Sequence, residues 1–231
     1  MAAKDIKLLG ARQSAFVNRV QFALNLKSIE YEFLQEDLFN KSELLLKSNP
    51  VHKQIPVLIH GDKPICESLV IVQYIDEVWS DAPSILPSHP YERANARFWA
   101  AYLDEKWIPL FRDLRTAKDD ESKAGVLEKI FEGLTSLEGV FVKSSKGKGF
   151  FGGETIGYLD IVLGSFLGWV KTSEIIGHVK ILDETKIPAL VDWAERFLAH
   201  EAIKGVILEP EELVNVLKGY LARVAAAAAS K

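Results

Sequence analysis

The chain has 231 residues, of which 48% are hydrophobic and 26% charged, with a formal net charge of −4 at pH 7. Its mean hydropathy of +0.05 is typical of a soluble globular protein and excludes a mainly disordered or collagen-like chain. The longest strongly apolar stretch without charged residues, 161–170, has ten residues, whereas a membrane-spanning helix needs roughly 20. Acidic residues outnumber basic ones on both sides of position 80, so no basic face for nucleic acid is expected.

The N-terminal sequence and the cysteine content bear on compartment and chemistry. The first residues, MAAKDIKLLG, have no signal-peptide pattern, so a cytoplasmic location is expected. The single cysteine, Cys66, excludes an intrachain disulfide, a dithiol redox pair and a cysteine zinc site, and we expect a buried core thiol. The five histidines show no metal-ligand spacing, and no metal cofactor is expected.

Residues 1–80 alternate between the period of strands and the period of helices. Ser14 and Ser68 are expected to cap two helices, and Asn49-Pro50 ends a third, because the residue before proline is pushed out of the helical region. The expected elements are a strand at 6–9, a helix at 16–24, a strand near 31–33, a helix at 41–48, strands at 57–59 and 64–67, and a helix at 69–79. This βαβαββα order predicts a thioredoxin-like α/β domain.

Beyond that domain the pattern is helical. Pro83, Pro87 and Pro90 break regular structure, so residues 81–90 are the expected linker and residues 91–231 an all-α domain. Its helices are expected at 94–114, 121–142, 159–171, 188–200 and 211–224. Gly157 and Asp160 form the pattern of a capped helix start, and the alanines at 225–229 are expected to be a fraying helix end.

Ser14 follows the first strand and precedes the first helix, a position that faces the substrate groove in a thioredoxin-like arrangement. Free backbone N–H groups and the helix dipole at such a terminus favour an anion. A serine hydroxyl keeps its proton near neutral pH, so it can donate a hydrogen bond to a thiolate and lower the pKa of that thiol. The alternative is a plain helix-capping serine.

Two more segments suit an extended ligand. If the Ile55-Pro56 bond is cis, as is often found before a strand in this fold, the backbone there can pair with a ligand like an added strand; a trans bond is the alternative. Glu67-Ser68, at another strand-to-helix junction, can bind an ammonium and a carboxylate, or merely cap the helix. Lys41 and Lys53 can neutralise a second carboxylate or remain solvated.

Together these segments resemble one family. Ser14-Ala15-Phe16-Val17, residues 36–42, residues 49–58 and Glu67-Ser68 closely resemble the tau class of plant glutathione transferases. The resemblance continues through residues 74–77, 97–99 and 152–160, so it covers nearly the whole chain. It implies a homodimer in which each subunit binds glutathione in the first domain and an apolar electrophile against the helical domain.

The resemblance also implies roles for individual residues. Ser14 matches the catalytic serine, and a serine there argues against relatives that need a nucleophilic sulfur for thiol transfer or dehydroascorbate reduction. The implied contacts are to glutathione for Lys41, Lys53, Ile55, Pro56, Glu67 and Ser68, to the acceptor for Phe16, Leu38, Ile108, Arg112, Arg115 and Trp169, and to the dimer partner for Glu77, Arg93 and Arg97.

The chain departs from the usual tau pattern at three positions. Arg12 stands where tryptophan is common, Ala15 where proline usually follows the serine, and Arg115 where an aromatic residue is often found. Without the proline, the loop around Ser14 is expected to be looser and thiol activation weaker. If Arg12, Arg112 and Arg115 point inward, they favour anionic acceptors such as fatty-acid hydroperoxides or carboxylated aromatics; otherwise they are solvated.

The predicted function is conjugation of the glutathione thiolate to hydrophobic electrophiles, a detoxification reaction, with peroxide reduction as a side activity. Two alternatives stay open. A ligand carrier of the same fold would bind apolar molecules and turn over slowly, and a purely structural protein would have no affinity for glutathione. The intact set of Lys53, Ile55-Pro56 and Glu67-Ser68 argues against the structural alternative.

Overall fold

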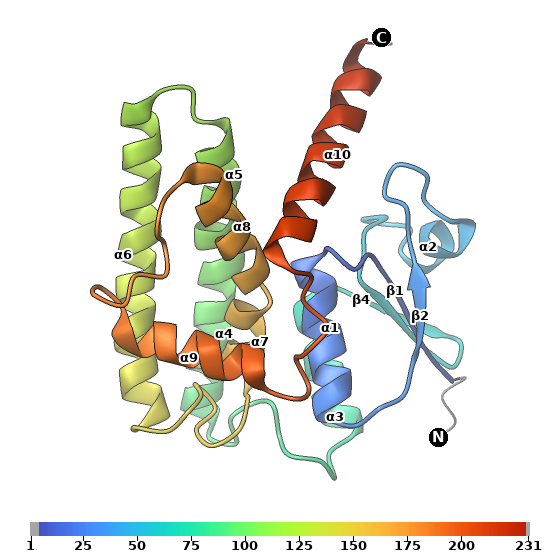
Figure 1. Ribbon diagram of the computed structural model, residues 1–231. Helices are drawn as coiled ribbons and strands as arrows, with labels where there is room; N and C mark the ends of the chain where they lie inside the picture. The colour runs from blue at the N-terminus through green and yellow to red at the C-terminus, as the bar shows by residue number, and fades with distance from the viewer. Residues whose placement is uncertain (1–4, 230–231) are drawn as a thin grey trace.

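The computed structural model describes residues 5–229 and has two parts, a sheet with its helices and a set of further helices (Figure 1). The order of elements in the first part is βαβαββα, so the predicted order is confirmed. These elements are β1 (Ile6–Gly10), α1 (Ala15–Leu26), β2 (Glu32–Gln35), α2 (Glu43–Ser48), β3 (Val57–His60), β4 (Lys63–Cys66) and α3 (Ser68–Val78).

The sheet has the strand order β2-β1-β3-β4, with β1 parallel to β2 and the other two pairs antiparallel. Successive residues of a strand point to opposite faces. Leu8 joins the core formed with α1 and α3. Leu9 packs with Leu45 of α2 on the other face. Different helices therefore cover the two faces, and β4 lies at an edge, where its Pro64 is tolerated.

The second part consists of helices that the sequence pattern located but did not divide correctly. The helix expected at 94–114 contains a π-helical turn, and the one expected at 159–171 breaks at Ser165 and Phe166. Leu103 and Trp107, at the two ends of the π turn, keep a helical spacing of four, and residues 161–170 carry no charge, so the hydrophobic pattern signals neither change. The elements are α4 (Pro90–Tyr102), the π turn (Leu103–Trp107), α5 (Ile108–Thr116), α6 (Asp120–Ser145), α7 (Tyr158–Gly164), α8 (Leu167–Gly177), α9 (Pro188–Ala199) and α10 (Pro210–Ala229).

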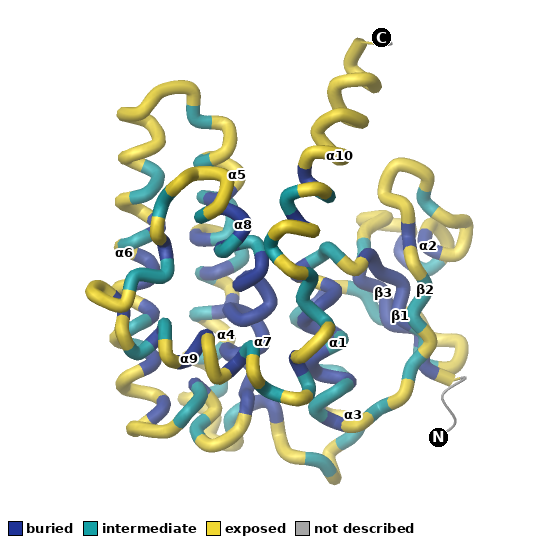
Figure 2. The backbone as a smooth tube through the Cα atoms, in the orientation of Figure 1, coloured by how far each residue is buried: buried dark blue, intermediate teal, exposed yellow. Residues whose placement is uncertain are grey.

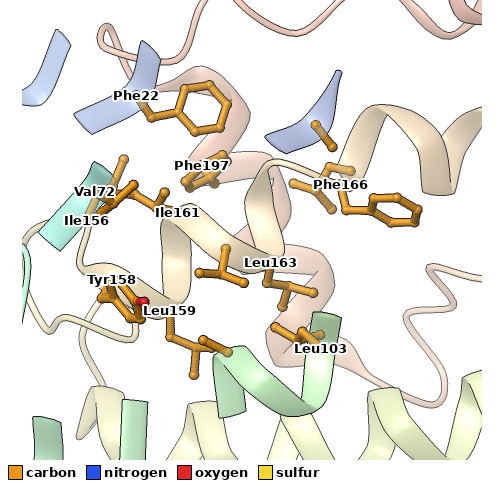
Figure 3. Packing of buried hydrophobic residues seen from close by; sticks show 14 of the residues in the cluster. Phe22, Val72, Leu103, Ile156, Tyr158, Leu159, Ile161, Leu163, Phe166 and Phe197 are labelled. Carbon is orange, nitrogen blue, oxygen red and sulfur yellow. The ribbon is translucent and has the colours of Figure 1, made fainter. Parts of the chain in front are cut away.

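One hydrophobic cluster extends through both parts. The ring of Phe22 on α1 meets that of Phe197 on α9 edge to face, with ring centroids 5.5 Å apart (Figure 3). α7 lies within this cluster, and every residue of α7 is buried (Figure 2). Because the two parts share one core, the helical part helps to fix the loops that the sheet carries.

A buried carboxylate caps α7, which confirms the predicted capped start. Asp160 accepts hydrogen bonds from the N–H groups of Phe151 (2.8 Å), Gly152 (2.9 Å) and Gly157 (2.8 Å), and from the indole N–H of Trp193 (2.7 Å). Burial raises the pKa of Asp160 to about 6, while the four donors act in the opposite direction by favouring the ionised form. The carboxylate therefore links the loop before α7 and helix α9 to the start of α7.

We expect Asp160→Ala to lower the free energy of unfolding by about 3–5 kcal/mol, because four buried donors lose their shared acceptor. The matched control is Asp119→Ala, which removes an exposed carboxylate that caps α6 by accepting from the Ser122 N–H at 2.7 Å. That change is expected to cost about 1 kcal/mol. Urea unfolding measures both, and equal losses would contradict the role given to Asp160.

Candidate functional site

Four loops with predicted ligand-binding residues meet at one end of the strands, where the chain leaves the sheet. The parallel strands β1 and β2 end there, at Gly10 and Gln35. β3 runs the other way and begins there at Val57, which pairs with Leu9 of β1 and with Cys66 at the end of β4. The structure therefore brings together segments that are far apart in the sequence. These segments are 11–14, 36–42, 53–56 and 67–68.

Ser14 lies at the start of α1, as predicted, with an extended backbone (φ −83°, ψ 115°). Its Oγ accepts a hydrogen bond from the Val17 N–H at 3.4 Å, and its own N–H donates to the Ala11 carbonyl at 2.9 Å. The capping bond uses a lone pair of the hydroxyl and leaves its proton available to another acceptor. Helix capping and donation to an anion are therefore compatible roles for this serine.

The Ile55-Pro56 bond directly before β3 is cis, as the family resemblance implied. Pro56 is buried, residue 55 is half-buried, and Lys53 is exposed with a positive φ of 54°. The side-chain amide of Asn49 braces the loop by donating to the Gln54 carbonyl at 3.0 Å. These contacts hold residue 55 at the end of the strands where the other three loops lie.

The β4–α3 junction carries Glu67 and Ser68. Glu67 is exposed and has a φ of 72°, and its Oε1 lies 3.9 Å from Nε2 of His52. The prediction that Ser68 caps α3 is wrong, because the left-handed backbone of Glu67 makes the turn one residue earlier and Ser68 becomes the first residue of the helix. The buried hydroxyl of Ser68 instead accepts from Nη1 of Arg19 at 3.2 Å.

Arg19 is a residue of this site that the sequence analysis missed. Its fully buried guanidinium donates to both carboxylate oxygens of Asp104, at 2.9 and 2.6 Å, and through Nε to the Ser165 hydroxyl at 3.2 Å. Asp104 balances the charge of Arg19, so the contribution of Arg19 to the junction is to hold the Ser68 hydroxyl in place. Its partners lie 49 to 146 residues away in the chain, so the local pattern shows only a polar position in a helix.

The β2–α2 connection carries Lys41. The buried Glu36 accepts from the Ser42 N–H at 3.1 Å and from the Ser42 hydroxyl at 2.6 Å, and Ser42 also caps α2. α2 begins at Glu43 rather than at the predicted position 41. Lys41 therefore lies in a braced, half-buried loop and not in a helix.

Three predicted acceptor residues share one face of α5. Ile108, Arg112 and Arg115 follow each other at spacings of four and three, which places them one above another. Desolvation and the neighbouring charge of Arg112 lower the pKa of the Arg115 guanidinium, while Tyr220 of α10 raises it. Arginine stays protonated under such shifts, so this face of α5 is cationic.

The other predicted acceptor residues come from three different segments: Phe16 from α1, Leu38 from the β2–α2 connection and Trp169 from α8. Phe16 and Leu38 expose 39% and 41% of their surfaces, although both are apolar. Trp169 on α8 is half-buried, and its indole N–H donates to the carbonyl of Gln13 at 2.9 Å. The helical part thus contacts the loop that carries Ser14.

Helix α10 contacts the β2–α2 connection, which the sequence analysis did not foresee. Arg223 donates to Asp37 at 3.3 and 3.1 Å and lies over the ring of Phe39, 4.0 Å from its centroid. The Phe39 ring also meets Tyr220, with centroids 5.5 Å apart. Figure 1 shows α10 passing between α8 and this connection. Leu38 therefore lies between two residues that α10 holds.

The three predicted dimer residues line one surface hollow of about 370 Å³ between α3, the linker and α4. Arg93 donates to two linker carbonyls, at 3.1 and 3.3 Å. Arg97 donates twice to Oε1 of Gln73, at 2.9 and 2.6 Å, and so connects α4 to α3. Glu77 is exposed beside them.

Other features of the described chain point away from the chemistry. A hollow of about 550 Å³ lies at the far end of α1, and its carboxylates, Glu30 and Glu201, disfavour an anionic ligand. Cys66 is half-buried rather than buried, its thiol donates to the Ser48 carbonyl at 3.6 Å, and desolvation raises its pKa. Within residues 5–229 no group of three acidic, histidine or cysteine side chains could hold a metal. No helix in that range is long and apolar enough to cross a membrane.

Comparison with known proteins shows the family to which the chain belongs. The model of the glutathione S-transferase N-terminal domain matches residues 4–77, and that of the C-terminal domain matches residues 120–196. Glutathione S-transferase U18 of Arabidopsis thaliana is 56% identical over 93% of this chain and 95% of its own length. The chain belongs to the tau class of plant glutathione S-transferases.

Solved structures of relatives agree with this assignment. The tau-class glutathione S-transferase of mango, Mangifera indica, has a TM-score of 0.92 to this transferase at 57% identity, covering 94% of this chain and 99% of that one. A rice glutathione S-transferase solved in complex with glutathione has a TM-score of 0.86 at 35% identity, covering 96% and 100% of the two chains. The predicted family, fold class and enzyme type are therefore confirmed.

Proposed function

We propose that this transferase activates glutathione through Ser14 and joins the thiolate to hydrophobic electrophiles. The proposal rests on three segments that meet at one end of the strands: Ser14, Ile55-Pro56 and Glu67-Ser68. A hydroxyl that caps α1 and keeps its proton available is suited to donate to a sulfur anion at the positive end of that helix. The rice relative solved with glutathione supports the choice of ligand.

Each polar group of glutathione has a residue of complementary charge or hydrogen-bonding capacity at this end of the strands. Its peptide backbone would pair with that of residue 55, in the manner of an added strand. Its glutamyl ammonium and carboxylate would meet Glu67-Ser68, where Arg19 holds the serine hydroxyl in place. Its glycyl carboxylate would face Lys41 and Lys53. With these contacts the thiol would lie near the hydroxyl of Ser14.

The reaction is a nucleophilic substitution or addition by sulfur. The bound thiol releases its proton to solvent, and the sulfur electron pair forms a bond to an electrophilic carbon. With a chlorinated aromatic acceptor, chloride leaves with the electrons of the broken carbon–chlorine bond, so one proton and one chloride are released per turnover. Rate enhancement comes from the supply of thiolate and from holding the two reactants together.

Ser14→Ala is expected to lower kcat/KM for a chlorinated nitroaromatic about a hundredfold, because a charge-assisted hydrogen bond to sulfur contributes about 2–3 kcal/mol. The pKa of the bound thiol, followed by thiolate absorbance, should rise by about 2 toward its free value. Ser14→Thr keeps the hydroxyl and is the matched control, which should retain most of the activity.

The same experiment separates the enzyme from the ligand carrier. A carrier would bind glutathione and apolar molecules, turn over slowly on several acceptors, and hardly respond to Ser14→Ala. If the wild-type chain does not bind glutathione at all, both the enzyme hypothesis and the ligand-carrier hypothesis are contradicted.

We further propose that the cationic face of α5 selects anionic acceptors. Arg112 and Arg115 lie on one helix face, close enough for the charge of the first to affect the second. A carboxylated or hydroperoxide acceptor that carries a negative charge would relieve this repulsion. Peroxide reduction with such acceptors would be a side activity of the same site.

Arg115→Ala is expected to lower kcat/KM about fivefold for a carboxylated aromatic acceptor and to leave its neutral ester unaffected, since a partly exposed ion pair contributes about 1 kcal/mol. Arg196→Ala, which removes an exposed arginine of α9, is the control. Equal turnover of the two acceptors before and after the Arg115 substitution would contradict the preference.

We also propose that the transferase is a homodimer whose contact face comprises α3 and α4. Glu77, Arg93 and Arg97 border one hollow on this face. Both helices also carry an exposed apolar side chain: Val70 on α3 is 52% exposed and Phe98 on α4 is 62% exposed. Exposed apolar side chains surrounded by charged groups are the usual composition of a protein interface.

Phe98→Asp is expected to convert a dimer to a monomer in sedimentation velocity, because a charge would be buried without a partner at the centre of the contact. Val142→Asp is the matched control, since Val142 is 59% exposed on α6, outside the proposed face. A wild-type chain that sediments as a monomer would contradict the proposal.

A further inference from the structure

One hydrogen bond from the helical part holds the loop before Ser14. The indole N–H of Trp169 donates to the Gln13 carbonyl at 2.9 Å, across 156 residues of sequence. That carbonyl and the Ser14 N–H belong to the same planar peptide group. The Ser14 N–H in turn donates to the Ala11 carbonyl at 2.9 Å. The peptide plane that enters Ser14 is therefore fixed at both of its polar ends.

Packing and hydrogen bonds also hold the backbone around Trp169 in place. A Cβ added at Gly168 would lie 2.7 Å from a methyl carbon of Ile207, so the start of α8 packs directly against the segment before α10. The Ser173 hydroxyl donates to the Trp169 carbonyl at 2.8 Å, and the Thr172 hydroxyl donates to the Gly168 carbonyl at 2.8 Å. The backbone of Trp169 is thus held by packing and by side-chain hydrogen bonds.

The loop has weak local restraints of its own. Residue 15 is alanine, so no ring fixes the φ angle at the first position of α1. The capping bond from the Val17 N–H to Ser14 Oγ is long, at 3.4 Å. The direction of the Ser14 hydroxyl therefore depends on the peptide plane that precedes it, which Trp169 fixes at the carbonyl end and Ala11 at the N–H end.

We propose that Trp169 is a positioning residue for thiol activation, which aims the Ser14 hydroxyl at the glutathione sulfur by holding the Gln13 carbonyl. The inference rests on the proposed role of Ser14 and extends it to a residue of the helical part. The family resemblance placed Trp169 among the acceptor residues; the role proposed here acts through the loop and is measured by the thiol pKa, which involves no acceptor. Trp169 replaces, by a tertiary hydrogen bond, the local stiffness that a proline at position 15 would supply.

The decisive variant is Trp169→Phe in the full-length protein, because phenylalanine keeps an aromatic ring and lacks the N–H donor. The pKa of bound glutathione is expected to rise, and kcat with a chlorinated nitroaromatic to fall about five- to tenfold, as loss of one hydrogen bond would produce. KM for glutathione should stay within about twofold, because the contacts to its backbone and carboxylates are unchanged. A merely structural tryptophan would leave the thiol pKa unchanged.

A second substitution tests the mechanism by rescue. Proline is well tolerated at the first position of a helix, and the extended backbone of Ser14, with ψ at 115°, is the conformation that a following proline requires. Ala15→Pro added to Trp169→Phe should restore most of the lost kcat and the low thiol pKa. If the double variant does not recover, the Trp169 hydrogen bond and a proline at position 15 do not restrain the loop around Ser14 in equivalent ways, and the proposal is contradicted.

Trp107→Phe is the matched control, because it also removes an indole N–H that donates to a backbone carbonyl, that of Ile130 at 3.1 Å. It should lower thermal stability and leave the thiol pKa unchanged. A pKa rise in this control as large as that in Trp169→Phe would overturn the proposal, since general loosening of the helical part would explain both.

Ser14→Ala separates failure of this inference from failure of the proposed function. If Ser14→Ala leaves the thiol pKa unchanged, the role of Ser14 is wrong and the inference falls with it. If Ser14→Ala raises that pKa and Trp169→Phe does not, only the inference is overturned. In the Ser14→Ala background Trp169→Phe should have almost no further effect, because it acts through the serine.

Discussion

The buried ion pair between Arg19 and Asp104 is the interaction on which the rest of this structure depends. Arg19 belongs to α1 and Asp104 to the π turn after α4, so the pair joins the two parts of the chain inside their common core. Loss of Asp104 would leave the fully buried guanidinium without a counter-charge, at a cost of about 3–5 kcal/mol. The guanidinium also holds the Ser68 hydroxyl. The same residue thus secures the packing of the two parts and one end of the proposed glutathione site.

The turn between α7 and α8 completes this link. Ser165 accepts from Arg19 at 3.2 Å, and Trp169 donates to Gln13 at 2.9 Å. A segment of five residues therefore contacts both α1 and the loop in front of it. α7 can hold that segment in place because it is buried and anchored by the four hydrogen bonds of Asp160. The loops of the sheet supply the binding groups, and the helical part supplies their fixed positions.

The sequence predicts the elements well because each of them has a strong local cause. Periodicity and Pro50 place the strands and helices of the first part, and Asp160 marks the start of α7. The π turn escapes prediction because its apolar ends, Leu103 and Trp107, keep a helical spacing, and the break after α7 escapes because the uncharged stretch 161–170 continues through it. Arg19 escapes for another reason: its four polar contacts are all distant in sequence. Roles for the acceptor and dimer residues came from resemblance to a family, and local physics alone would not have assigned them.

The exchange of a proline for an alanine after Ser14 has a structural consequence beyond a looser loop. A proline restrains the chain in the unfolded state as well as in the folded one, so its effect is local and independent of the remaining fold. The hydrogen bond from Trp169 exists only when α8 lies against the loop before α1. The geometry around Ser14 is therefore complete only after both parts of the chain have joined. Opening of the junction between the two parts would therefore disturb both ends of the proposed site together, the loop before Ser14 through Trp169 and the Ser68 hydroxyl through Arg19.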